Sequence, residues 1–241
     1  MNKKLCLNSA NDEGGKYLNL SILSLLDNMT HRKVSILTFS PQEKKDLIVS
    51  WLTLSLAFAV MINPIFFNIT SFIISLPIAL VAVGTGFVLH ELAHREAAKS
   101  FGFHSEFRAW YGGLALAVGL AIVTQGQFLF AAPGATYFIG ENVTRKQNGI
   151  ISAAGPITNL VIGIILLIIG SQLEGFFQTT LVYAAIVNFM FAAFNLLPFF
   201  VLDGTKVIAW KPLLWAALIF ISGLLALMPQ IVLIPLGIKG F

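Results

Sequence analysis

The chain has 241 residues, of which 57% are hydrophobic and 11% are charged; its formal net charge is +4 and its mean hydropathy is +0.84. Soluble domains carry about 25% charged residues, so this composition excludes a disordered chain, a coiled coil and an ordinary cytosolic enzyme, and predicts a polytopic protein in a lipid bilayer. The 15 basic residues form no Arg/Lys stripe with interleaved aromatic residues, so we expect no binding to nucleic acid.

The first 46 residues are the only polar stretch of any size, and they hold seven Lys and Arg residues. Basic segments favour the cytoplasmic side of a membrane. We therefore expect residues 1–46 to form a cytoplasmic N-terminal segment. Residues 47–241 are expected to form the membrane-embedded part of a multi-pass protein of the cell membrane.

A helix is predicted to start near Pro41, since Ser40 can cap it, Pro suits the first helical position and Glu43 can reach back to the cap. No charged residue then occurs between residues 47 and 90, which is room for two spans of roughly 20 residues each. We predict span one at about Leu47–Met61, and span two from about Ser71 to beyond His94.

The next uncharged stretch, 109–140, is too short for two crossings, which need about 40 residues. Irregular backbone at membrane depth occurs only where it is buried in protein or lines a wet cavity. Two basic residues at the exit of the stretch favour a return to the cytoplasmic side, so a re-entrant hairpin is predicted instead of a single crossing. Within it, Phe128–Ile139 is predicted to be extended, with Pro133-Gly134 as a turn.

Three further uncharged stretches each have room for one span. We predict these spans at about Gly149–Gly170, Thr179–Phe199 and 212–238, the last with a possible break at Pro229 into a sixth short segment. The predicted fold is thus an all-α polytopic membrane protein with five or six transmembrane helices and a short re-entrant β or hairpin element after the second span. The catalytic core is placed at about 71–211.

The sequence His90-Glu91-Leu92-Ala93-His94 is an HExxH motif at the end of the second apolar run. Residues four apart lie on one face of a helix, so both imidazoles can bind one Zn²⁺ ion, with Glu91 beside it as general base. Short motifs also arise by chance. Here, however, each ionisable group at bilayer depth costs roughly 2.5–3.5 kcal/mol on insertion scales, and a metal ion compensates for three of them.

Two histidines leave a catalytic zinc ion one protein ligand short. His104 is a candidate, although a surface position in a loop is the alternative reading. Asp203, at the end of the fourth predicted span, is the better candidate; the alternative is that it caps a helix or closes the span at the water interface. If 109–140 returns to its starting side, the second and fourth spans run toward the same leaflet, and Asp203 can meet the histidines.

Three longer motifs contain these residues. They are His90-Glu91-Leu-Ala-His94 with Ala97-Ala98-Lys99-Ser-Phe-Gly102, then Ser152-Ala-Ala-Gly155-Pro156-Ile-Thr-Asn159, and finally Asn188 followed by Phe194-Asn195-Leu-Leu-Pro198 and Leu202-Asp203-Gly204. On these motifs, the sequence resembles the site-2 proteases, which are intramembrane zinc metalloproteases. The resemblance covers most of residues 47–211 and is closest to the compact archaeal and bacterial members without a PDZ or CBS domain.

The resemblance implies one zinc ion per chain, held by His90, His94 and Asp203, with Glu91 as the catalytic base. It implies hydrolysis of peptide bonds in transmembrane protein substrates, regulated intramembrane proteolysis, and an extended substrate held at 128–139. Asn195 and Asn159 are the implied substrate-binding candidates, Asn195 at the substrate or the developing oxyanion, whereas the role of Asn159 is left open. The sequence departs from the family pattern at three positions, none of them a ligand: Ala93 and Thr205 replace Gly, and Val201 replaces Pro.

Two other functions share part of this pattern. Intramembrane His and Asp residues also mark ion paths, so an ion or metal transporter is one alternative. It predicts polar residues along several spans, whereas here they gather at one leaflet. The second alternative is a homologue that binds membrane helices without cutting them, and the presence of Glu91 argues against it.

Overall fold

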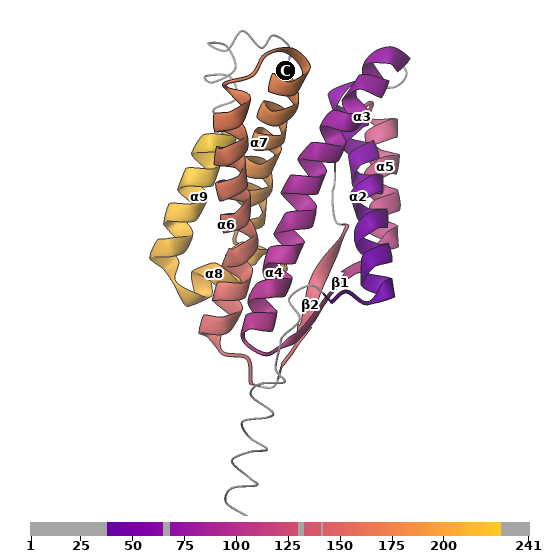
Figure 1. The fold of residues 1–241 in the computed structure, drawn as a ribbon. Helices are drawn as coiled ribbons and strands as arrows, with labels where there is room; N and C mark the ends of the chain where they lie inside the picture. The colour runs from indigo at the N-terminus through magenta and orange to yellow at the C-terminus, as the bar shows by residue number, and fades with distance from the viewer. Residues whose placement is uncertain (1–37, 65–67, 130–132, 141, 228–241) are drawn as a thin grey trace, which may run out of the picture. The chain divides into compact units, whose positions relative to one another are not determined.

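The computed structural model describes residues 38–64, 68–129, 133–140 and 142–227 (Figure 1). Among them, four helices are long and apolar enough to cross a membrane: α2 (Pro41–Ile62), the continuous run Ile69–Ser100, α6 (Arg145–Gly170) and α7 (Gly175–Asn195). Three shorter helices are α5 (Tyr111–Val123), α8 (Asp203–Trp210) and α9 (Pro212–Leu227), of which α5 and α9 are apolar. The prediction of a helical polytopic membrane protein with a small β element is confirmed.

The first span begins where the local sequence predicts. The side chain of Ser40 accepts a hydrogen bond from the backbone N–H of Glu43, and Pro41 opens α2. The predicted reach of the Glu43 carboxylate back to the cap is wrong, because this carboxylate accepts a hydrogen bond from the backbone N–H of Phe107 at 3.1 Å. The predicted N-terminal segment lies, up to residue 37, outside the described residues.

The second span contains a short π-helix. The run is divided into α3 (Ile69–Val83), the π-helical turn η1 (Gly84–Val88) and α4 (Leu89–Ser100). A π-helical turn makes i→i+5 hydrogen bonds and is frequent at functional sites. Here it lies directly before α4 and therefore sets the direction in which the HExxH side chains leave the helix.

The β element is a two-stranded antiparallel sheet of β1 (His104–Ala109) and β2 (Gly134–Ile139), with Phe107 opposite Thr136. The chain leaves β1 through α5 and comes back as β2, so the predicted return of 109–140 is confirmed. In the segment 128–139, which was predicted to be extended, residues 134–139 form β2, and residues 130–132 lie outside the described residues. The predicted turn at Pro133-Gly134 is wrong, because Gly134 is the first residue of β2 and pairs with Ala109 of β1. Gly134 has φ +148°, and a Cβ there would overlap the carbonyl oxygen of Arg108, so this close approach requires glycine.

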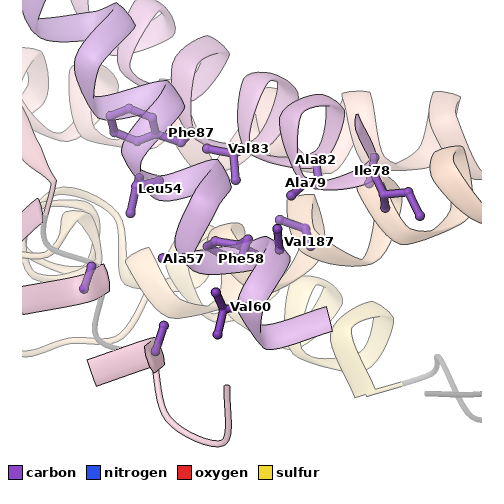
Figure 2. Close-up of a cluster of buried hydrophobic side chains, with 14 of the residues drawn as sticks. Leu54, Ala57, Phe58, Val60, Ile78, Ala79, Ala82, Val83, Phe87 and Val187 are labelled. Atoms are coloured by element: carbon purple, nitrogen blue, oxygen red, sulfur yellow. The ribbon is translucent and has the colours of Figure 1, made fainter. Parts of the chain in front are cut away.

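The main hydrophobic core joins α2, α3, α5 and α7. Figure 2 shows side chains of α2, among them Leu54 and Phe58, beside those of α3, with Val187 of α7 in the same cluster. Several members are alanines, Ala57, Ala79 and Ala82 in the figure, which let helix backbones approach closely. This packing fixes α3, and with it the continuous α4, against α2, α5 and α7.

The remaining helices end close to the predicted positions. α6 begins after a capping box of Thr144 and Gln147, and α7 ends at Asn195, four residues before the predicted end. A turn leads from α7 to α8. α9 covers the first part of the predicted span 212–238, and its continuation beyond Leu227 lies outside the described residues.

Candidate metal centre

Three side chains meet where α4 and α8 approach each other. His90 Nε2 and His94 Nε2 are 2.9 Å apart. Asp203 Oδ2 lies 3.3 Å from His90 Nε2 and 3.0 Å from His94 Nε2. Both histidines are buried, and the Asp203 side chain is only 12% exposed. In the described part of the chain, this is the one group of three or more His, Cys, Asp or Glu side chains able to hold a metal ion.

The triangle of ligand atoms has the size that zinc requires. Zinc binds His nitrogen and carboxylate oxygen at about 2.0–2.2 Å, so two ligands of a tetrahedral site lie about 3.3 Å apart. The three distances between the ligand atoms fall at or slightly below this value. Three protein ligands leave the fourth position open, which is the arrangement of a catalytic site and not of a structural one.

The hydrogen bonds behind the histidines determine where their protons lie. The Nδ2 of Asn159 donates to the carbonyl oxygen of Gly86 at 2.8 Å, so its Oδ1 faces His90 Nδ1 at 2.7 Å. The carbonyl oxygen of Ile151 lies 2.7 Å from His94 Nδ1. Both of these oxygens only accept hydrogen bonds, so each Nδ1 carries a hydrogen. In a neutral imidazole, each Nε2 then carries no hydrogen and has a lone pair free to bind a metal ion.

The resulting set of donor atoms calls for a cation. Two lone pairs and a carboxylate oxygen about 3 Å apart repel one another unless a positive charge lies between them. A cation between these three atoms favours the ionised form of the Asp203 carboxyl. Asp203 is thus an anionic ligand, and the residues present fit a zinc ion.

The turn before α8 brings Asp203 to the histidines. Asp203 is the first residue of α8, and no side chain caps this helix. A Cβ at the neighbouring Gly204 would overlap the carbonyl oxygen of Leu196 at the end of α7 and lie 2.6 Å from that of Leu197. Glycine therefore permits the close approach that directs the Asp203 carboxylate toward α4 instead of toward its own helix.

Gly155 of α6 packs directly against the metal ligands. A Cβ at this position would lie 2.5 Å from His94 Nε2 and 2.7 Å from His90 Cε1. The sequence motif contains this glycine but does not reveal what it contacts. A side chain here must displace at least one imidazole.

We expect Gly155→Ala to weaken zinc binding by more than the 10–100-fold that loss of a ligand's hydrogen-bond partner costs, because it moves the ligand itself. Titration of purified protein against a chromophoric zinc chelator measures the change. The matched control is Gly119→Ala on α5, where a Cβ meets no atom within 4 Å. Unchanged zinc affinity in the Gly155 variant would contradict the packing described above.

The general-base candidate lies beside the sheet. The hydroxyl of Thr136 on β2 lies 2.8 Å from Glu91 Oε2 and 3.1 Å from the backbone oxygen of Glu91. Sequence reasoning missed Thr136, which belongs to no motif and comes 45 residues after Glu91. Thr136 could have been found only from the packing of β2 on α4, which the sequence does not reveal.

The other predicted residues have different positions. Asn159 is fully buried behind His90. Asn195 is the last residue of α7, and its Nδ2 donates to the carbonyl oxygen of Phe191 in the same helix at 3.0 Å. His104 lies on β1 with its side chain 71% exposed and 3.7 Å from Glu106, so this alternative third ligand points away from the centre.

A protein of Methanocaldococcus jannaschii named "Putative zinc metalloprotease" is 40% identical to this chain over 189 residues, which are 76% of this chain and 92% of the relative. No protein-family model matches the chain. No solved structure matches it either.

Proposed function

The chain belongs to the zinc metalloprotease family of its archaeal relative, and from this premise we propose that it is an intramembrane protease of the site-2 type. It hydrolyses peptide bonds within or next to the transmembrane helices of protein substrates. The cluster of His90, His94 and Asp203 carries the proposal, because its two histidines lie on a helix that is long and apolar enough to span a membrane. We place the protein in the cell membrane with residues 1–46 in the cytoplasm, because these residues are basic.

The proposed reaction uses the residues at the centre in distinct roles. His90, His94 and Asp203 would hold the zinc ion, which would supply Lewis-acid activation of water and of the peptide carbonyl. Glu91 accepts a proton from the attacking water as the new C–O bond forms. It then gives the proton to the leaving amine as the C–N bond breaks. Asn159 and the Ile151 carbonyl keep the two imidazoles in the tautomer that a metal needs.

Asn195 is the proposed contact to the developing oxyanion. An amide nitrogen has two hydrogens, and the hydrogen bond to Phe191 uses one of them. The second can be donated to the substrate oxygen. A donor of this kind stabilises charge that develops in the transition state.

The free edge of β2 is the proposed place for the unwound substrate. The outer edge of β1 is already used, because Glu43 accepts from the N–H of Phe107 at 3.1 Å and Asp46 accepts from the N–H of Ala109 at 3.2 Å. Within the described ranges, no strand lies on the far side of β2. An extended peptide can add there as a third strand, next to Glu91.

The test is zinc-dependent cleavage of a model transmembrane peptide by the full-length protein in liposomes. We expect cleavage in the presence of zinc, loss of cleavage on chelation, and recovery when zinc is added back. Asp203→Ala should lose both zinc and activity. Movement of zinc across the vesicles without cleavage would favour the transporter, and peptide binding at full zinc content without cleavage would favour the non-catalytic homologue.

A further inference from the structure

A threonine on the sheet contacts the general-base candidate of α4. Thr136 Oγ1 lies 2.8 Å from Glu91 Oε2, within ordinary hydrogen-bond distance. We propose that Thr136 is a positioning residue that holds the Glu91 carboxylate in the orientation for proton transfer and ties this orientation to the docked substrate strand. This inference rests on the proposed function.

The side chain of Thr136 acts on one oxygen of the carboxylate. A hydroxyl has one hydrogen to donate, and of the two acceptors on Glu91 the carboxylate Oε2 at 2.8 Å is nearer than the backbone oxygen at 3.1 Å. A hydrogen bond to Oε2 restricts rotation of the long Glu91 side chain. The other oxygen, Oε1, is then the one left to take the proton of water.

The backbone of Thr136 faces the proposed substrate position. The N–H groups of Phe107 and Ala109 point away from β2, toward the carboxylates of α2. Their partners across the sheet are Thr136 and Gly134, so these are the non-hydrogen-bonded pairs of the antiparallel ladder. In such a pair, both residues direct N–H and C=O outward, so the peptide groups of Thr136 lie on the free edge of β2.

Thr136 therefore links the general-base candidate Glu91 to the proposed substrate strand. A strand that adds to β2 bonds to the main chain at Thr136, while the hydroxyl of the same residue holds Glu91. Docking of the strand limits the motion of Thr136 and, through the hydrogen bond, the motion of the carboxylate. The hydroxyl should then affect the chemical step and not the binding of substrate.

The test compares Thr136→Val, which removes the hydroxyl at nearly constant shape, with Thr136→Ser, which keeps it. We expect Thr136→Val to lower kcat about 10- to 100-fold, the range for a lost hydrogen bond to a charged group, with KM and zinc content unchanged. Thr136→Ser should keep kcat within about threefold of the wild type. The matched control is Thr180→Val on α7, where the hydroxyl donates to the Phe176 carbonyl of the same helix.

The outcomes separate this inference from the proposed function. Wild-type kcat in Thr136→Val, or no rescue by Ser, would overturn the positioning role while cleavage by the wild type stands. A change in KM or zinc content at constant kcat would also overturn it. If the valine variant does not fold, Thr136→Ala is measured instead. Zinc-loaded wild type that cleaves no transmembrane peptide would overturn both proposals.

Discussion

Glu91→Gln is expected to abolish cleavage of a transmembrane peptide while leaving the zinc content unchanged. Gln has the shape of Glu but cannot accept a proton from water at neutral pH. General acid–base catalysis contributes about 10²- to 10⁴-fold, so the rate should fall by at least this factor. Glu91 is not a member of the three-ligand cluster, so zinc remains bound. Initial rates in liposomes and metal analysis of the same sample measure both quantities.

The control makes the same chemical change elsewhere. Glu174→Gln alters an exposed residue before α7, where no side-chain cap bond is made. It should cleave like the wild type. Loss of zinc in Glu91→Gln would assign Glu91 a structural role, and full activity would require another base.

Local spacing in the sequence predicts two of the three ligands of the metal centre. Two histidines four residues apart face the same side wherever a helix forms, so His90 and His94 can be paired without a structure. Asp203 requires a topological argument, namely that 109–140 returns to its starting side. The charges around that stretch are sufficient for the argument. In the structure, the antiparallel pairing of β2 with β1 brings the chain back to the side where the stretch began.

The contacts that the residues behind the ligands make are not visible in local sequence patterns. Asn159 and Gly155 come from another helix, and only the contact of α6 with α4 shows that one orients His90 and the other makes room for both imidazoles. Thr136 depends on the packing of β2. Each of these contacts joins residues far apart in the chain, and hydrophobic periodicity reports only on neighbours within one element.

Two features of the fold could also not be predicted from the hydrophobic pattern of the sequence. The π-helical turn Gly84–Val88 adds to a helix that is hydrophobic on all sides, so no periodic signal reveals it. Strand β1, His104–Ala109, is short and contains charged residues, and its stability depends on pairing with β2 and on carboxylates of α2. Short strands of this kind are defined by their tertiary partners and not by propensity.

The second large effect is expected from Arg95→Met. Arg95 follows His94 directly and is 1% exposed. Its Nε lies 2.8 Å from Glu43 Oε1, its guanidinium lies 4.1 Å from the ring centre of Phe39, and it also pairs with Glu96. Glu43 is fully buried and accepts the N–H of Phe107 as well. The ion pair thus joins the HExxH helix, the first span and the sheet.

Met fills much of the space of Arg but leaves the Glu43 carboxylate buried without its cation. Breaking a buried pair in this way costs about 3–5 kcal/mol. Denaturant or thermal unfolding in detergent micelles measures the loss. The control is Arg108→Met, whose partner is Glu106; because the Arg108 side chain is 41% exposed, the expected loss is less than about 1 kcal/mol.

A double variant separates the charge from the packing. In Glu43→Gln with Arg95→Met, both charges of the pair are removed and no Glu43 carboxylate is left without its cation, so the loss of stability should be smaller than in Arg95→Met alone. The N–H of Phe107 can still donate to the amide oxygen of Gln, so the edge of β1 stays paired. If the losses of the two single variants simply add, the ion pair contributes no coupling, and Arg95 stabilises α4 through its contacts with Phe39 and the surrounding side chains instead.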